Sequence, residues 1–316
     1  MDYYIVIPAH NEEKFIARTL QSLVSQTILP KKVVVVNDNS TDQTANIIND
    51  FVKKHSFFTL INTTSKTIHL PGSKVIQAFY KGFEILDDQY DIIVKLDADL
   101  ILPNTYFETI IGHFENDSTI GMAGGFAYIE NQNKQKLPAN NSKLNYETAE
   151  ENEQEWILEN LTNKDHIRGA FKAYRKACFK QIGGLKPAMG WDTVDELLCR
   201  FYNWNIVTDA SLKVKHLKPT GTNYNKTSRY KQGEAFYTLG YGLFITAIAS
   251  AKLAMMKKKP LLFIDYIKGF WKAKRNNTPL LVTTEQAQFI RAHRLKKIKE
   301  KLMGSLRLTL ISEKTL

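Results

Sequence analysis

Apolar residues along the first hundred positions of the chain follow two alternating patterns. Four continuous apolar runs predict buried strands, at residues 3–7, 32–36, 57–61 and 91–96. Between the runs, apolar positions recur every three or four residues, which predicts amphipathic helices at 15–24, 45–52 and 75–83. Because wholly apolar strands alternate with helices, we expect an α/β fold with a mostly parallel sheet and helices on both of its faces.

The pattern is less regular after residue 100. Apolar runs predict three further strands, at 122–130, 205–209 and 212–217. The acidic stretch 147–161 is expected to be helical, and the polar stretch 131–145 before it a loop. We therefore expect a Rossmann-like domain over residues 1–225 and a basic, amphipathic helical extension over residues 226–316.

Polar residues follow three of the predicted strands at the point where each strand ends. These strand exits are Pro8-Ala9-His10-Asn11-Glu12, Asn37-Asp38-Asn39-Ser40 and Asp97-Ala98-Asp99. In open parallel sheets, ligands bind in the crevice beyond the carboxyl ends of the strands. The exits therefore predict one binding site, rich in carboxylates, at a single edge of the sheet.

Asp97 and Asp99 are two carboxylates, two positions apart, at the end of a strand. Such a pair can share Mg²⁺ or Mn²⁺ with a diphosphate, since these cations bind a few protein oxygens and complete their shell with phosphate and water. The alternative is a polar turn ahead of a helix that Pro103 opens. His216, taken alone in its predicted strand, is more often a packed or hydrogen-bonded core residue than a ligand.

Asp38 follows the second strand, where a carboxylate could meet the imide edge of a uridine or guanosine base. The alternative is that Asp38, Ser40 and Asp42 only form a turn and cap the next helix. Ser40, Thr41 or Asp42 is expected to provide that cap, which leaves Asp38 unexplained by capping alone.

The segment Gly190–Glu196 holds a further group of carboxylates. An acceptor hydroxyl that attacks an anomeric carbon needs a base near the new bond. Asp195 is our first choice for this base, and Asp192 and Glu196 are its rivals. The alternative is an exposed acidic start of a helix over residues 197–202.

Charge is spread unevenly over the 316 residues. The net charge is +11, but residues 213–316 contain 22 lysines and arginines against 5 acidic residues. An anionic partner is expected for this basic tail. The weakly hydrophobic run 232–256, with lysines and Trp271 nearby, suggests peripheral contact with an anionic membrane surface. The alternative is a helical extension that closes over the acceptor site, and nucleic acid is disfavoured because no recognition motif accompanies the charge.

The two cysteines form no CxxC pattern, and the start of the chain lacks a basic region and a cleavage site. We therefore expect a cytoplasmic protein, with the option of peripheral contact at the cytoplasmic face of the inner membrane.

Over its first 220 residues, the chain resembles the family 2 glycosyltransferases of the GT-A fold. The motifs that carry the resemblance lie, in order, at 7–12, 36–42, 97–99, 168–175 and 182–184. One motif departs from the family pattern, because Asp195 stands five residues before Arg200 instead of the commoner six.

The resemblance implies an enzyme that moves a hexosyl-type sugar from a UDP- or GDP-type donor to a glycan or lipid-linked acceptor. It implies a nucleotide-sugar site formed by Pro8, Ala9, His10, Glu12, Asp38, Asn39, Lys74 and Asp97. It implies a Mn²⁺ or Mg²⁺ site with Asp99, Asp97 and His216. It also implies Asp195 as the base of a one-step inverting transfer, with Arg168, Gly169 and Trp191 on the acceptor side. Bacterial surface-polysaccharide synthesis is the implied role.

Two other functions remain alternatives at this stage. A nucleotidyltransferase could share the sheet and the carboxylates, but the loop after the first strand, residues 8–12, has no glycine. A catalytically inactive module that binds nucleotide sugars or carbohydrate would not need both the paired aspartates and an acidic residue at the base position.

Overall fold

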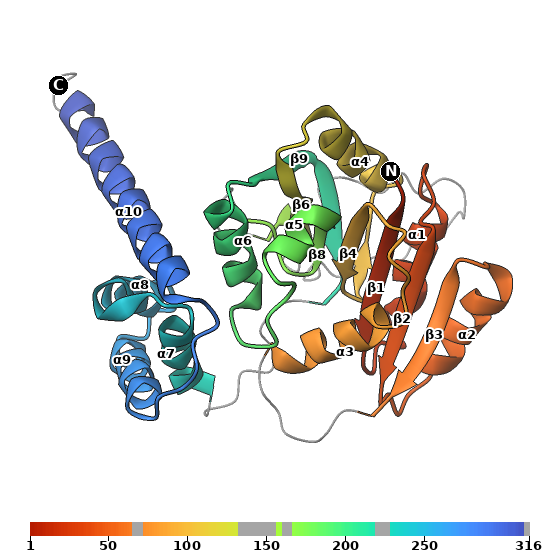
Figure 1. Cartoon of the computed structure of the whole chain (residues 1–316), viewed down its shortest axis with the longest axis horizontal. Helices are drawn as coiled ribbons and strands as arrows, with labels where there is room; N and C mark the ends of the chain where they lie inside the picture. The colour runs from red at the N-terminus through yellow and green to blue at the C-terminus, as the bar shows by residue number, and fades with distance from the viewer. Residues whose placement is uncertain (65–71, 132–155, 160–165, 219–227, 313–316) are drawn as a thin grey trace, which may run out of the picture. The chain divides into compact units, whose positions relative to one another are not determined.

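The structure is a computed structural model that describes residues 1–64, 72–131, 156–159, 166–218 and 228–312 (Figure 1). Its contacts form two compact units. The first unit comprises Met1–His69, Lys74–Leu185 and Asn203–Thr222, and the second comprises Leu70–Ser73, Lys186–Tyr202 and Asn223–Leu316. These units divide the chain differently from the predicted domains 1–225 and 226–316, which stay a prediction.

The first unit is built on a sheet to which nine strands contribute within the described residues. The strands are β1 (Tyr3–Ala9), β2 (Lys32–Asp38), β3 (Phe58–Thr63), β4 (Ile92–Leu96), β5 (Leu100–Ile101), β6 (Ile120–Glu130), β7 (Trp156–Leu158), β8 (Phe171–Arg175) and β9 (Asn205–His216). Their order is β3-β2-β1-β4-β8-β6-β9-β5, and β7 pairs with β6. Strands β3, β2, β1 and β4 are parallel, as expected. Beyond β4 the sheet is mixed, because β8 runs antiparallel to both β4 and β6.

Three predicted elements of this unit, two strands and one helix, differ from the structure. Residues 205–216 form the single strand β9, whose pairing with β6 shifts register near Gly124. Residues 156–158 form β7 instead of a helix, since their backbone pairs with the end of β6. Long-range ladder hydrogen bonds here outweigh the local helical pattern. The rest of the predicted helix 147–161, except Glu159, and nearly all of the predicted loop 131–145 lie outside the described residues.

Helices cover both faces of the parallel strands. The helices of this unit are α1 (Ile16–Val24), α2 (Thr44–Lys54), α3 (Ser73–Phe83), α4 (Tyr106–Asn116) and α5 (Lys176–Gln181). Helix α3 approaches closely at Gly82, where an added Cβ would lie 2.6 Å from Val6 and 2.7 Å from Val36. Ile5 and Val35 point to the opposite face and are also fully buried. The fixed sheet holds the strand ends in a constant relation to one another.

The second unit is helical. It contains α6 (Trp191–Phe201), α7 (Ser228–Thr238), α8 (Gly242–Met256), α9 (Leu261–Arg275) and α10 (Thr284–Ser312). The apolar run 232–256 is not one helix, because the chain turns at Gly240, whose φ of 72° is left-handed, between α7 and α8. Helix α6 packs against α10 through Phe201 and Phe289, whose ring centroids lie 5.5 Å apart. Among the described helices, none has the length and apolar character needed to cross a bilayer.

Candidate functional site

The exits of β1 and β2 are tied together, as neighbouring parallel strands allow. The His10 ring donates through Nδ1 to the carbonyl oxygen of Asp38, at 2.6 Å. The Asn11 amide donates to Ser40 Oγ at 3.0 Å. Asn11 and Asn39 both have left-handed φ angles, of 54° and 55°, which asparagine tolerates better than most residues. The two loops therefore form one rigid wall at the carboxyl edge of the sheet.

Asp38 is hydrogen-bonded to β3 in the described structure, and the start of α2 has another partner. Asp38 Oδ1 accepts a hydrogen bond from Thr63 of β3, at 3.3 Å, and its side chain is buried. The first turn of α2 is instead served by Asp42, whose Oδ1 accepts from the Thr44 amide at 3.0 Å. Of the three predicted capping residues, Asp42 thus satisfies the helix start, from two positions ahead of it.

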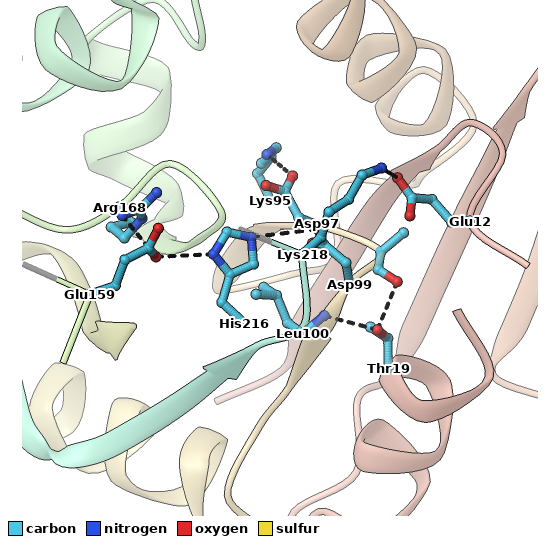
Figure 2. A network of polar contacts seen from close by, with 11 residues as sticks. Glu12, Thr19, Lys95, Asp97, Asp99, Leu100, Glu159, Arg168, His216 and Lys218 are labelled. Atoms are coloured by element: carbon cyan, nitrogen blue, oxygen red, sulfur yellow. Dashed lines mark hydrogen bonds and ion pairs between the residues drawn. The ribbon is translucent and has the colours of Figure 1, made fainter. Parts of the chain in front are cut away.

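The turn Asp97–Asp99 is held in place by buried hydrogen bonds from several segments. The Asp97 amide donates to Ala170 at 2.7 Å, and the Asp99 carbonyl accepts from the Leu217 amide at 2.9 Å. Thr19 of α1 donates to the Ala98 carbonyl at 2.8 Å and accepts from the Leu100 amide at 3.0 Å (Figure 2). The turn is therefore rigid before any ligand binds.

Helix α4 begins at Tyr106, so Pro103 is not its first residue. The short strand β5 lies between the aspartate turn and Pro103. Asp99 is also only 8% exposed. The helix thus begins three residues after Pro103, and the choice between a metal-binding pair and a polar turn ahead of this helix stays a prediction.

Cations of the chain meet the carboxylates of this edge. Three ion pairs form the cluster: Lys95 with Asp97, His216 with Asp99 at 3.5 Å, and Lys218 with Glu12 at 2.9 Å (Figure 2). Figure 2 shows that these side chains come from separate segments, the ends of β1, β4 and β9, and point toward one another. The structure thus brings Glu12, Asp97, Asp99 and His216 together, as the sequence predicted.

His216 is the centre of a longer chain of contacts. Its Nδ1 lies 3.0 Å from Glu159 Oε2, which in turn lies 2.9 Å from Arg168 Nη1. Burial by itself would lower the pKa of His216, but hydrogen bonds with Asp99 and Glu159 raise it to about 9. The imidazole is consequently a cation at neutral pH, and it belongs to the charged cluster instead of the apolar core.

The carboxylates repel one another despite these pairs. Burial raises the pKa of Asp97, and the charge of Asp99 raises it further, whereas Lys95 opposes both effects. Burial also raises the pKa of Glu12, and Asp99 and Asp97 add to the shift, while Lys218 opposes it. A further positive charge bound here would relieve this repulsion.

The donor atoms suit a hard divalent cation. Asp97, Asp99 and Glu12 offer carboxylate oxygens, the ligands that Mg²⁺ and Mn²⁺ prefer. Glu12 Oε2 is buried and has no hydrogen-bond partner within the described structure. As the side chains stand, no three His, Cys, Asp or Glu residues of the described ranges form a ready metal cluster. A cation would therefore have to compete with His216 for Asp99.

The other predicted site residues of the first unit make no contact with the ion-pair cluster that the described structure records. Pro8 and Ala9 are the last two residues of β1, and Gly169 is buried next to Arg168. Lys74 lies in the first turn of α3 with a half-buried side chain.

The predicted base lies in the second unit, on α6. This helix begins at Trp191, after Gly190 with a φ of 85°, so the carboxylates lie inside it and not ahead of it. Asp195 and Glu196 are 1% and 7% exposed. The alternative of an exposed acidic helix start is therefore wrong for these two residues, and the assignment of Asp195 as base, with Asp192 half-buried beside it, stays a prediction.

Four residues of the cluster were missed from the sequence: Thr19, Lys95, Glu159 and Lys218. Two of them left a signal. Lys95 is a lysine inside an otherwise apolar strand, and Thr19 is a hydroxyl on the apolar row of a helix. Glu159 lay in a stretch with a helical pattern, and Lys218 in a basic segment, so neither could be singled out.

Comparison with known proteins places this site in a family context. Probable glycosyltransferase YdaM of Bacillus subtilis is 30% identical over 209 residues, which cover 63% of this chain and 46% of that protein. Poly-beta-1,6-N-acetyl-D-glucosamine synthase of Staphylococcus epidermidis is 25% identical over 196 residues, 60% of this chain and 41% of the synthase. The matched part is thus less than half the length of these two relatives.

The fold comparison agrees with the expected GT-A class. The mannosyltransferase PcManGT from Pyrobaculum calidifontis, solved in complex with GDP-Man and Mn²⁺, superposes with a TM-score of 0.53 at 13% identity. The match covers 94% of this chain and 80% of that one. A sequence model of glycosyl transferase family 2 matches residues 4–183, more than half of the chain. The protein is therefore a member of glycosyl transferase family 2.

Proposed function

We propose that this protein transfers a hexosyl-type sugar from a UDP- or GDP-type donor to a hydroxyl of a glycan or lipid-linked glycan. The observation that carries the proposal is the cluster of Glu12, Asp97, Asp99 and His216 at the carboxyl edge of the parallel strands. This is the edge where open α/β sheets bind their ligands. Membership of the family supports the reaction class, and its surface-polysaccharide relatives support the choice of acceptor.

The nucleoside would bind along the exits of β1 and β2. Pro8, Ala9, His10, Asp38 and Asn39 line these exits, and the bond from His10 to the Asp38 carbonyl keeps them at a fixed spacing. Because the two loops are already held at a fixed spacing, they lose less conformational entropy when a ligand binds between them.

The diphosphate would bind at the ion-pair cluster. Asp97 and Asp99 would hold Mn²⁺ or Mg²⁺, and this cation would supply neutralising charge for the departing nucleoside diphosphate. His216 would contact the phosphates as a cation, or the metal as a neutral imidazole once the bound cation has displaced its proton, and Lys74 would add a basic group near the donor. The presence of Mn²⁺ with GDP-Man in the PcManGT structure supports this assignment.

The acceptor hydroxyl would lose its proton to Asp195, with Asp192 and Glu196 as rivals, and would attack the anomeric carbon in one step. This displacement inverts the anomeric centre. Arg168, Gly169 and Trp191 would lie on the acceptor side.

Isothermal calorimetry with a panel of nucleotide sugars, with and without Mn²⁺, tests the donor site. Asp99→Ala should abolish the metal-dependent part of donor binding, because it removes the favoured metal ligand. Asp50→Ala, which removes an exposed carboxylate of α2, is the matched control and should bind as the wild type does. Undiminished donor affinity in Asp99→Ala would refute the site.

Transfer itself is tested separately. Asp195→Asn should bind donor normally and lose transfer, and normal turnover would transfer the role of base to Asp192 or Glu196. A wild-type protein that binds donor, yet neither transfers nor hydrolyses the sugar with Mn²⁺ present, would identify the chain as an inactive binding module.

We propose that this activity takes place in the cytoplasm, with the option of peripheral contact at the cytoplasmic face of the inner membrane. The chain has two cysteines, which form no CxxC pattern, and this low cysteine content supports a reducing compartment.

A further inference from the structure

Helix α9 of the second unit is held against α7 at very short range. An added Cβ on Gly233 of α7 would lie 1.8 Å from the carbonyl oxygen of Tyr266, and one on Gly269 of α9 would lie 2.1 Å from that of Tyr230. Only glycine allows two helix backbones to approach so closely. Tyr266 and Phe270 of α9 are buried in the same contact. The face that α9 turns outward is therefore fixed.

The outward face of α9 carries residues at spacings of three and four, which align along one side of a helix. These residues are Leu261, Ile264, Lys268, Trp271 and Arg275. All five side chains are exposed, and Leu261 reaches 73% exposure. An apolar first half is thus followed by a cationic, tryptophan-containing second half. This combination is typical of helices that lie in the interface of a membrane.

The turn between α8 and α9 extends the apolar half. Met255 and Met256 at the end of α8 are 78% and 55% exposed. Lys257, Lys258 and Lys259 follow directly, and the turn is closed by a hydrogen bond from the Lys259 amide to the Ala254 carbonyl at 3.0 Å. Large apolar side chains are therefore held beside lysines by a defined backbone. Isolated exposed apolar residues are ordinary, but a contiguous group of them marks an interaction surface.

Charge favours an anionic partner for this surface. Residues 257–275 contain seven lysines and arginines and a single acidic residue, Asp265. A cavity of about 810 Å³ opens among Tyr230, Lys268, Trp271 and Arg275, with further basic residues in its lining. Lys274 Nζ lies 5.0 Å from the centre of the Trp271 ring. Cations around an aromatic side chain would suit the phosphate and glycerol of a lipid headgroup.

We propose that the outward face of α9, together with the α8–α9 turn, docks onto an anionic lipid bilayer. Leu261, Ile264 and the two methionines would enter the boundary between headgroups and acyl chains, while Lys268, Arg275 and their neighbours bind headgroup phosphates. Nucleic acid would use the cations but would gain little from the exposed methionines and leucine. The docking itself does not depend on the proposed function. Its biological role does, since an enzyme held at the bilayer would meet a lipid-linked acceptor there.

This surface shares Met255, Met256 and Trp271 with the one that the sequence suggested, but most of it lies on a later helix. The run 232–256 forms most of α7 and all of α8, and these helices bury Phe236, Ile245 and Ala254 within the unit. The following helix, α9, has the exposed apolar and basic face. The proposed contact therefore moves to the segment that contains Trp271.

Co-sedimentation of the full chain with vesicles tests the proposal. Vesicles of phosphatidylcholine mixed with phosphatidylglycerol should bind the protein at low salt, and vesicles of phosphatidylcholine alone should bind it far less. Neutralising Lys268, Lys272 and Arg275 to Gln should weaken binding by about 100-fold, since each basic residue near an anionic surface contributes about fivefold. The control neutralises Lys53, Lys54 and Lys81 of the first unit and should change binding by less than about twofold.

The apolar contribution has its own pair of variants. Leu261→Ser should reduce binding to the mixed vesicles, while Ile85→Ser, at an exposed isoleucine of the first unit, should not. Circular dichroism would verify that each variant is folded. Absence of vesicle binding, or equal losses in test and control variants, would overturn the proposal. So would light scattering that shows a dimer dispersed by Leu261→Ser, because the surface would then bind a second copy of the chain. Donor calorimetry on the same variants should be unchanged, so a failure of the donor site and a failure of membrane docking can be told apart.

Discussion

Thr19 provides a sharp test of how the aspartate turn is held. Its hydroxyl is completely buried, donates to the Ala98 carbonyl and accepts from the Leu100 amide, so it bridges both sides of the turn that carries Asp97 and Asp99. Thr19→Val keeps the size and shape of the side chain and removes both hydrogen bonds. Thr19→Ser keeps the hydroxyl and removes one methyl group.

The two substitutions should differ in cost. In Thr19→Val, a buried carbonyl and a buried amide lose their partner, and each such group costs about 1–3 kcal/mol, so we expect a loss of about 3 kcal/mol. In Thr19→Ser, one buried methyl group is lost, at a cost of about 1 kcal/mol. An apolar role for this position would give the opposite order, because valine fills the site and serine leaves a void.

Urea denaturation followed by circular dichroism and tryptophan fluorescence measures both costs, as shifts of the unfolding midpoint at constant slope. Thr109→Val is a suitable control, since its hydroxyl makes one hydrogen bond, to Thr105, on the exposed side of a helix. Thr19→Val should also weaken donor binding, because the turn would lose its fixed position. A midpoint for Thr19→Val equal to or above that of Thr19→Ser would refute the reasoning.

Further predictions concern charge and packing. The pKa of His216 is raised from 6.5 to about 9, so its charged form adds about 3 kcal/mol to the free energy of unfolding. This contribution is complete below about pH 6.5 and is lost as pH rises through about 9. Urea midpoints of the metal-free protein that do not fall between pH 7 and 10 would contradict this. Glu159→Gln removes one of the two carboxylates that raise this pKa, so an NMR titration should find the pKa of His216 lower than in the wild type. Gly233→Ala should destabilise the second unit by several kcal/mol, about 3 or more, because the new Cβ would meet the Tyr266 carbonyl, and a thermal melt would show it. Gly112→Ala, whose Cβ would meet nothing within 4 Å, should instead stabilise its helix by up to about 1 kcal/mol, and equal melting shifts in the two variants would be inconsistent with a close helix crossing.

Much of the arrangement at the carboxyl edge of the sheet could be predicted from the sequence. Wholly apolar runs such as Val33–Val36 can be satisfied only between two layers of helix, and neighbouring parallel strands place their carboxyl ends at a common edge. The contact between Asp38 and the loop at His10, and the meeting of Glu12 with Asp97 and Asp99, follow from these two rules. Local chemistry also showed that Asp38 was not needed for capping.

The local sequence pattern predicted the wrong secondary structure where a segment pairs with backbone far away in the chain. Residues 156–158 carry a helical pattern but pair with β6, and two predicted strands are one. The run 232–256 reads as one apolar segment, yet a glycine with left-handed φ divides it. In each case the decisive contact is made by a residue far away in the sequence or by a backbone angle that composition does not reveal.

The sequence by itself determined the alternating strands and helices of the first hundred residues and the acidic edge that they create, because burial of apolar runs leaves few other arrangements. Only the tertiary structure decided how that edge is charged. Lys218 reaches Glu12 across 206 positions, and Glu159 meets His216 from just beyond β7, a strand that the local pattern did not predict. Pairing between such distant groups depends on strand register and on the path of the sheet, since an ion pair forms only where both side chains arrive within about 4 Å of each other.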